Sequence, residues 1–212
     1  LSAALALSLC AMPAMAEDVT GETTTTAPLA SAIDKSAKGT ITIHKYEYNG
    51  NDDKNGTGVA GDANNVPTDA KDLEGATFTY YQVMTADELV EYYNGKSTEK
   101  VGINTYVDEN GQILSAYANK PNGSGKTGKN GIVKFGDGET GLPVGLYVII
   151  ETETPAKVTT PVEPFLVSLP MANPTNKAEW MYDVYVFPKN ATTYGKVTLE
   201  KKGRVGGGTP EN

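Results

Sequence analysis

Apolar and polar residues alternate along much of the chain, which predicts a series of short β-strands. In residues 39–48, Ile41, Ile43 and Lys45 fall on one face of an extended segment, which we expect to face the core. The opposite, outer face carries Thr40, Thr42, His44 and Tyr46. Further strands are predicted at residues 76–84, 102–107, 131–135, 145–153, 164–170 and 180–187.

One helical segment interrupts this pattern. Residues 85–88 have the form of a capping box, with Thr85 as the N-cap and Glu88 at the third helical position. The helix is predicted to run to about Tyr93 and to close near Gly95. Residues 112–118 are predicted as a short helix or irregular structure, and the Gly-rich stretches 49–67 and 122–131 as loops and turns.

Short strands separated by turn signals predict an all-β sandwich with a short helical insertion. The composition agrees, because only 39% of the 212 residues are hydrophobic, while Gly, Pro and Tyr number 23, 12 and 12.

The N-terminal residues are typical of a secretory leader. Residues 1–11 are apolar or small, and Ala14-Met15-Ala16 fits a cleavage site, so residues 1–16 are predicted to be a signal peptide truncated at its start. The apolar run is too short for a membrane-spanning helix, which needs roughly 20 residues. Leu9 is unsuited to lipid attachment at Cys10. Removal of the signal peptide would also remove Cys10, the one cysteine of the chain. The mature protein could then form no internal disulfide, and its stability outside the cell would need another source.

Three further regions are expected. Residues 17–38, rich in Thr, Ala and Ser, are predicted to be a disordered mature N-terminus. Residues 39–194 form the main domain. Residues 196–202 repeat the pattern of the first strand, so 195–212 is predicted to be the start of a second, truncated domain of the same type.

The charge of the chain excludes some partners. A formal charge of −8 argues against binding to nucleic acid or to anionic membranes. His44 is the only histidine, so transition-metal binding and Ser-His or Cys-His catalysis have no basis, and neither a metal nor a cofactor is predicted.

The stretch Trp-Met-Tyr-Asp-Val-Tyr-Val-Phe-Pro-Lys-Asn at residues 180–190 resembles the W-x-x-x-V-x-V-Y-P-K pilin motif of sortase-assembled shaft pilins of Gram-positive bacteria. The matching residues are Trp180, Val184, Val186, Phe187 (in place of Tyr), Pro188 and Lys189. The resemblance implies that Lys189 is an acceptor amine. A pilus-specific sortase would hold the preceding subunit as a thioester, and attack by the lysine would join neighbouring pilin subunits. Strand phase independently places Lys189 on the outer face, opposite Val184 and Val186.

A second motif covers residues 145–155. It resembles the E-box of these pilins, Y-x-L-x-E-T-x-A-P, through Tyr147, Ile149, Glu151, Thr152 and Pro155, with Thr154 where Ala is usual. Glu151 shares a strand face with Tyr147 and Ile149, but Glu153 has the same parity. Phase alone leaves both carboxylates open, and the register of the motif favours Glu151.

Together the motifs imply an Ig-like sandwich of the Cna B type. In such domains a first-strand lysine and a last-strand asparagine form an isopeptide bond that a buried acid promotes. The resemblance carries these roles to Lys45, Asn190 and Glu151. Burial would lower the pKa of Lys45 and keep Glu151 protonated, so that Glu151 could polarise the Asn190 carbonyl while ammonia leaves. The alternative is that Lys45 extends from a strand edge to solvent.

These inferences predict a secreted, wall-attached structural subunit of a cell-surface pilus that is not an enzyme. One alternative is a wall-anchored adhesin, or a tip or basal pilin, that binds host protein or glycan through residues 49–67 or 85–130. Another is a secreted hydrolase that pairs carboxylates such as Glu151 and Asp183.

Overall fold

The computed structural model describes residues 32–48, 59–60, 66–96, 101–137, 140–176 and 178–190. The predicted signal peptide at residues 1–16 and the predicted second domain at 195–212 lie outside these ranges. Within them, no helix is both long enough and apolar enough to cross a membrane.

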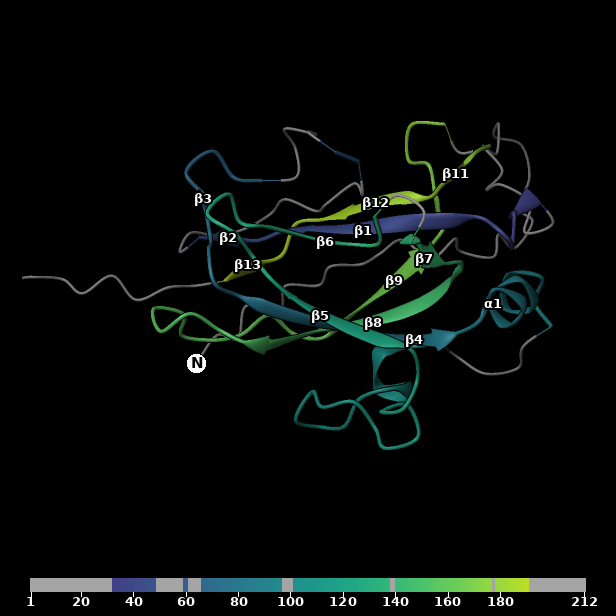
Figure 1. Ribbon diagram of the computed structural model, residues 1–212, viewed down its shortest axis with the longest axis horizontal. Coiled ribbons are helices and arrows are strands. Elements are labelled where there is room, and N and C mark those ends of the chain that lie inside the picture. Colours follow the sequence, from purple (N-terminus) through teal and green to yellow (C-terminus); the bar gives the residue numbers. More distant parts are fainter. Residues whose placement is uncertain are drawn as a thin grey trace, which may run out of the picture.

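Two sheets face each other across the domain (Figure 1). In the first, β1 (Lys38–His44) lies between β12 (Asp183–Val186), which is parallel to it, and β6 (Ile132–Phe135), which is antiparallel. The short β7 (Leu142–Pro143) also pairs with β1. The second sheet is antiparallel, with β5 (Asn122–Lys126), β4 (Thr77–Met84), β8 (Gly145–Glu153) and β9 (Phe165–Leu169) in that order. The predicted β-sandwich is confirmed.

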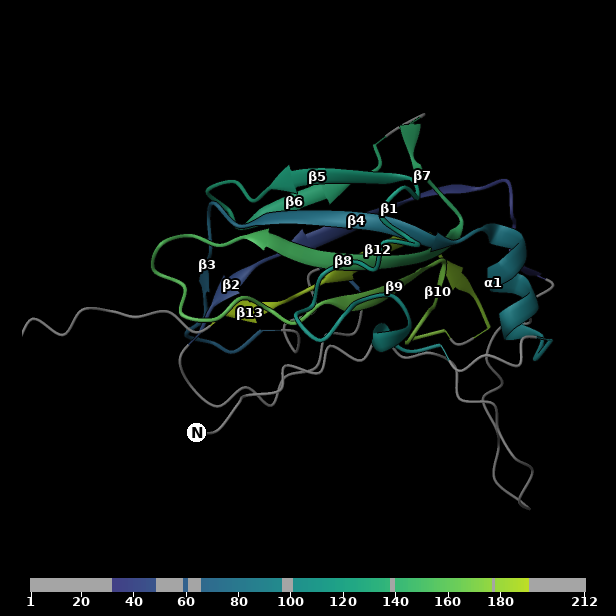
Figure 2. The ribbon, with the colours of Figure 1, turned by 90° about the horizontal axis from the view of Figure 1, so that it is seen from below.

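Smaller elements close the ends of the sandwich. A short sheet of β13 (Lys189–Asn190), β2 (Tyr46–Glu47) and β3 (Lys71–Asp72) lies at one end. Helix α1 (Ala86–Tyr93) lies at the other end (Figures 1 and 2). The remaining elements are the pair β10 (Met171–Ala172) and β11 (Trp180–Met181), and the 3-10 turn η3 (Ile103–Thr105).

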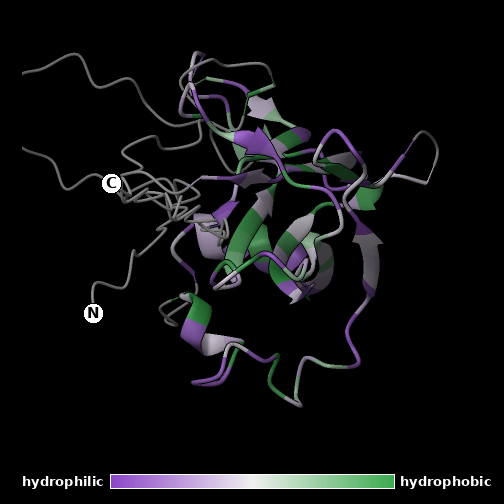
Figure 3. Cartoon of the chain, turned by 90° about the vertical axis from the view of Figure 1, so that its left-hand side faces the viewer, coloured by the Kyte–Doolittle hydropathy of each residue, from purple (hydrophilic) through white to green (hydrophobic). Residues whose placement is uncertain are grey.

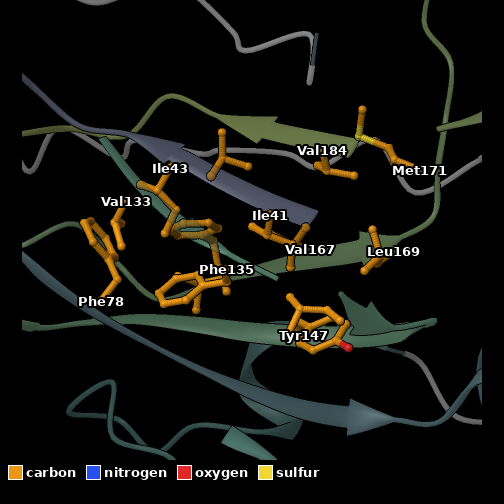
Figure 4. Close-up of a cluster of buried hydrophobic side chains, with 14 of the residues drawn as sticks. Ile41, Ile43, Phe78, Val133, Phe135, Tyr147, Val167, Leu169, Met171 and Val184 are labelled. Atoms are coloured by element: carbon orange, nitrogen blue, oxygen red, sulfur yellow. The ribbon is translucent and has the colours of Figure 1, made fainter. Parts of the chain in front are cut away.

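Apolar side chains from both sheets form the central core. Figure 4 shows Ile41 and Ile43 of β1 opposite Tyr147 of β8 and Val167 of β9. A second cluster forms on the other face of β8, where Leu146, Val148 and Ile150 pack with Leu89 of α1 and residues of the 101–117 segment. Hydrophobic positions gather mainly on the strands in the middle of the domain (Figure 3). Strand β8 is therefore buried on both faces.

The helix prediction is confirmed. The Thr85 hydroxyl accepts a hydrogen bond from the Glu88 N–H, and the Glu88 carboxylate accepts one from the Thr85 N–H at 2.7 Å. This hydrogen bond lowers the pKa of Glu88. Gly95, just beyond the helix, has a φ of 67°, a left-handed conformation that favours glycine.

Three predictions of secondary structure were wrong. Residues 122–126 form strand β5 rather than a turn, because Gly123 and Gly125 let it pass close to Tyr80 and Val133, where a Cβ would lie 2.7 and 2.6 Å from side-chain atoms. Residues 103–105 form a 3-10 turn instead of a strand. The strand predicted at 180–187 is divided into β11 and β12, because Trp180–Met181 pairs with β10 and Asp183–Val186 with β1.

The first predicted strand also differs in detail. It is divided at Lys45, where the chain leaves β6 and β12 and pairs next with β3 and β13. Thr40 and Thr42 are buried although they lie on the predicted outer face, because their short side chains lie next to longer cross-strand neighbours: Asp183 beside Thr40, and Tyr185 and Lys134 beside Thr42. Packing starts before the predicted boundary at residue 39, since Ile33 is buried in the second cluster.

The contact between β1 and β12 requires glycine at position 39. A Cβ on Gly39 would lie 2.1 Å from the Tyr182 carbonyl oxygen, which already accepts the Thr40 N–H. We expect Gly39→Ala to lower the free energy of unfolding by about 1–3 kcal/mol, the usual range for overpacking. Urea denaturation measures this change.

The matched control is Gly102→Ala, where an added Cβ meets no atom within 4 Å. Its stability should stay close to that of the unmodified chain. Equal stabilities of the two variants would contradict the steric explanation.

Candidate functional site

Lys45 occupies the point where the first strand changes partners. Its backbone N–H donates to the Gly131 carbonyl at 2.8 Å, and its carbonyl accepts from the Leu73 N–H at 2.9 Å. These bonds hold the backbone extended between β1 and β2, so the side chain stays in phase with Ile41 and Ile43 and points into the core. The predicted burial of Lys45 is confirmed, with a relative exposure of 0%.

The Lys45 amine meets two polar side chains inside the domain. Its Nζ lies 2.5 Å from Oδ1 of Asn190 on β13 and 3.1 Å from Oε2 of Glu151 on β8. The Phe78 ring lies 5.5 Å from the same nitrogen. The three polar residues are far apart in the sequence, and the sandwich brings them together between its sheets.

Glu151 is the hydrogen-bond acceptor of this group. The Asn190 Nδ2 donates to its two oxygens at 3.1 and 3.0 Å, and the Val162 N–H donates to Oε2 at 2.8 Å. The carboxyl therefore contacts the amide nitrogen of Asn190 and the amine of Lys45. We predicted that Glu151 would hydrogen-bond the Asn190 amide and polarise its carbonyl; Glu151 accepts from the amide nitrogen, and the carbonyl oxygen lies against Lys45.

Burial dominates the electrostatics of the amine. It lowers the pKa of Lys45 to about 8, while the charge of Glu151 and its hydrogen bond act in the opposite direction. A larger fraction of Lys45 is therefore uncharged near neutral pH than of an exposed lysine. An uncharged amine next to a carboxamide carbon and a proton-accepting carboxyl is an arrangement capable of amide exchange.

The structure distinguishes the two carboxylates that strand phase left open. Glu151 is buried, but Glu153 is exposed and accepts a hydrogen bond from Thr77 at 2.9 Å. The strand passes from the interior to the surface between the two residues. The predicted choice of Glu151 as the core-facing carboxylate is thus supported by its position.

The other residues of the 145–155 motif are structural. Tyr147 and Ile149 belong to the central core, and the Tyr147 hydroxyl donates to the Pro143 carbonyl at 2.5 Å. Thr152 is exposed, and its hydroxyl lies 3.2 Å from that of Thr79. The carbonyl of Pro155 accepts the Val158 N–H at 2.9 Å and so begins the turn after β8.

The 180–190 motif spans the length of the sandwich. Val184, Val186 and Pro188 are buried, as predicted from strand phase, whereas Lys189 is half-buried on the opposite face. Asn190 follows it and returns to the interior at 3% exposure. Two adjacent residues of β13 therefore present an amine outward and an amide inward.

The aromatic residues of that motif lie apart from each other. The Phe187 ring has its centroid 6.4 Å from that of His44, near the end of the domain that carries Lys189. Trp180 instead stacks on Tyr93 of α1, with centroids 5.4 Å apart. Trp180 therefore anchors the helix to β11 and does not share the surroundings of Lys189.

The carboxylate pair considered for a hydrolase does not form. Asp183 is exposed and accepts a hydrogen bond from Thr40 near the start of β1, whereas Glu151 contacts Lys45 beyond its end. The loop at residues 49–67, considered for host binding, lies mostly outside the described residues.

Sequence reasoning missed two supporting contacts. The Val162 N–H is a backbone donor to Glu151, so no side chain could have signalled it. Lys157, in the loop after β8, places its Nζ 2.5 Å from the Glu47 carboxylate. Glu47 is buried and pairs in register with Asn190, so this contact fixes the loop over the β2–β13 pair.

Comparison with known proteins identifies relatives of the chain. Residues 36–191 match the family described as Gram-positive pilin subunit D1, N-terminal domain. The chain is 36% identical over 193 residues to fimbrial subunit type 1 of Actinomyces viscosus and 30% identical over 190 residues to fimbrial subunit type 2 of Actinomyces naeslundii. These alignments cover 90% and 82% of this chain but 32% and 34% of the relatives, so the chain spans about a third of their length.

Solved structures share the fold. The fimbrial protein FimP from Actinomyces oris is 31% identical with a TM-score of 0.51, over 76% of this chain and 31% of that one. The full-length major pilin SpaD from Corynebacterium diphtheriae is 26% identical with a TM-score of 0.51, over 76% of this chain and 34% of that one.

In the variant Asn190→Ala the Lys45 amine has no amide to react with. The lowered pKa of Lys45 predicts that the free energy of unfolding of this variant depends on pH. Folded Lys45 loses its proton near pH 8, whereas unfolded Lys45 keeps it until about 10.5. The unfolded state then binds more protons, so we expect the free energy of unfolding to rise between pH 8 and 10, by about 2–3 kcal/mol. Denaturant unfolding at each pH measures this.

The double variant Asn190→Ala, Lys45→Met is the control. Tyr46 and Tyr147 have pKa values raised by burial in both proteins, so their contribution cancels in the difference. If the free energies of unfolding of the two variants changed with pH in the same way, burial would not lower the pKa of Lys45.

Proposed function

Since this chain belongs to the Gram-positive pilin subunits, as a D1 N-terminal domain, we propose that it is the acceptor domain of a covalently assembled pilus shaft. In this proposal a pilus-specific sortase joins the preceding subunit to Lys189. An internal amide bond between Lys45 and Asn190 holds the domain together. The whole protein is secreted and attached to the cell wall as part of a cell-surface pilus.

The observation that carries this proposal is the opposite orientation of the two residues of β13. Lys189 and Asn190 are neighbours, yet one faces the outside of the sandwich and the other lies 2.5 Å from the buried Lys45 amine. A strand alternates its side chains between faces, so a single strand supplies both chemistries. Each needs its own environment, because a sortase must reach Lys189 while the internal reaction needs the exclusion of water.

The internal reaction follows from the contacts of Glu151. The Lys45 nitrogen attacks the side-chain carbonyl carbon of Asn190, a C–N bond forms, and the bond to Nδ2 breaks. Glu151 lies 3.1 Å from the attacking nitrogen and 3.0 Å from the leaving one. It can therefore take a proton from the first and deliver one to the second, which departs as ammonia. The reaction needs no oxidant and no metal.

The bond would stabilise both the domain and its attachment. It closes a loop that includes most of the described domain, and chain-entropy models assign a crosslink of this span about 5 kcal/mol. A pull on Lys189 also acts directly on β13, a strand of two residues. Bonding Asn190 to Lys45 ties that strand to the end of β1.

The internal bond is tested by the intact mass of the purified protein. We expect a mass lower than the calculated one by one ammonia, because amide formation releases Nδ2 of Asn190. Lys45→Ala, Asn190→Ala and Glu151→Ala should each have their full calculated mass.

Lys134→Ala is the control, since Lys134 lies on β6 with its side chain 46% exposed. It should retain the loss of ammonia. A full calculated mass for the unmodified protein would remove the internal bond from the proposal and leave the role of Lys189 to be judged separately.

The role of Lys189 is tested with a pilus-specific sortase and a donor peptide that carries an L-P-x-T-G-type signal. We expect one donor per chain, attached at Lys189, and no product from Lys189→Arg, because a guanidinium keeps its proton and cannot attack a thioester. Lys134→Arg should react normally. Peptide mapping identifies the attachment site, and a product on Lys189→Arg would place the acceptor elsewhere.

A further inference from the structure

A chain of hydrogen bonds joins Asp72, His44 and Tyr46 on the surface of the domain. The His44 Nε2 lies 2.8 Å from Oδ1 of Asp72, and the Tyr46 hydroxyl lies 2.7 Å from the other ring nitrogen of His44. The rings of His44 and Tyr46 are also in contact, with centroids 4.2 Å apart. Strands β1, β2 and β3 each contribute one member.

The chemistry of the partners sets the direction of these hydrogen bonds. An Asp72 carboxylate can only accept, so Nε2 of His44 carries the proton. In a neutral imidazole Nδ1 is then an acceptor, and the Tyr46 hydroxyl must donate to it. The oxygen lone pairs of Tyr46 remain directed away from His44. The order carboxylate, imidazole and hydroxyl is the one that moves a proton from the hydroxyl side toward the carboxylate.

Lys189 lies on the strand next to Tyr46, the last member of this chain. Strands β13 and β2 are parallel neighbours, and Lys189 is paired in register with Tyr46. Directly paired residues point to the same face of a sheet. Their neighbours Asn190 and Glu47 are both buried, whereas Lys189 and Tyr46 are both half-buried, so the shared face is the outer one. His44 is 23% exposed and Asp72 44%, so the group is open to an approaching protein.

An acceptor lysine must lose a proton before its amine can attack, and a second proton as the new bond forms. An ordinary lysine has a pKa of about 10.4, so near neutral pH it is almost wholly a non-nucleophilic ammonium. Attack on a thioester also leaves a surplus proton on the nitrogen. A proton acceptor next to Lys189 would relieve both limits.

We propose that Asp72, His44 and Tyr46 form a proton relay that serves Lys189 during subunit joining, an inference that rests on the acceptor role proposed above. As the amine attacks the thioester carbon, the C–N bond forms and the C–S bond breaks, with its electron pair leaving on the sortase sulfur. The amine proton passes to the Tyr46 oxygen while the Tyr46 proton passes to Nδ1 of His44. Asp72 stabilises the resulting imidazolium. Tyr46 acts on the reacting amine directly, whereas His44 and Asp72 are positioning residues that act through Tyr46.

The surroundings of Tyr46 suit a transmitting role. Burial, and then the charge of Asp72, raise its pKa to about 12, so the phenol stays protonated across the neutral range. It therefore relays a proton and does not store one. The other titratable groups on the strands around His44 are Glu47 on β2, Lys71 on β3, Lys134 on β6, and Asp183 and Tyr185 on β12.

The test compares Tyr46→Phe with the unmodified chain in the sortase reaction with the donor peptide, from pH 6 to about 10. The variant keeps the ring and loses the hydroxyl. We expect kcat at neutral pH to fall roughly 10- to 100-fold with KM within about twofold, within the range of general-base effects. The deficit should shrink toward pH 10, because in alkaline solution a lysine amine needs less help in losing its proton. His44→Gln should show the same alkaline shift.

Tyr92→Phe is the matched control, because Tyr92 lies on α1 at the opposite end of the domain. Dividing each variant's rate by the Tyr92→Phe rate at the same pH removes the pH dependence of the sortase itself. A denaturant melt of each variant verifies that it is folded.

The outcomes separate the relay from the acceptor role. An alkaline shift in Tyr46→Phe and His44→Gln, with attachment mapped to Lys189, supports the relay. Attachment at Lys189 with pH profiles equal to that of Tyr92→Phe overturns the relay and leaves the acceptor role intact. Attachment at another residue, or none in the unmodified chain, overturns both.

Discussion

The burial of the Lys45 amine is the constraint on which the rest of the domain depends. An ionisable amine without water must be neutralised or paired, and an unpaired buried charge costs several kcal/mol. Here Asn190 and Glu151 satisfy it, and they come from β13 and β8. The contact therefore requires both layers of the sandwich and strand β13 to be in place. Local structure alone cannot supply it.

The same requirement explains the short sheet at that end of the molecule. The chain changes partners at Lys45, so that β2 can pair with β13 and bring Asn190 over the amine. Once Asn190 faces inward, alternation directs Lys189 outward. On our proposals, the pairing register of β13 with β2 would thus determine the positions of both the internal bond and the bond between subunits. A slip of one residue would exchange the two environments and abolish both reactions.

The insertion of α1 and the 101–117 segment has a different consequence. It covers the outer face of β8, so the run from Gly145 to Glu151 is buried without interruption. Alternation normally distinguishes inside from outside, but a strand covered on both faces does not show it. Glu151 and Glu153 also have the same strand parity, so the choice between them depended on where the strand leaves the interior.

The sequence by itself determined the sandwich class, the capped helix, and the inward phase of Ile41, Ile43 and Lys45, because these follow from local periodicity and capping chemistry. Strand phase also placed Lys189 on the outer face, and the resemblance of the motifs singled out Asn190 as the partner of Lys45. Only the tertiary structure decided that β5 is a strand, because its glycines show no hydrophobic pattern and are explained by contacts with β4 and β6. It likewise decided how Glu151 approaches Asn190 and that Asp72 meets His44, since long-range contacts depend on how the sheets pack, and no local pattern records them.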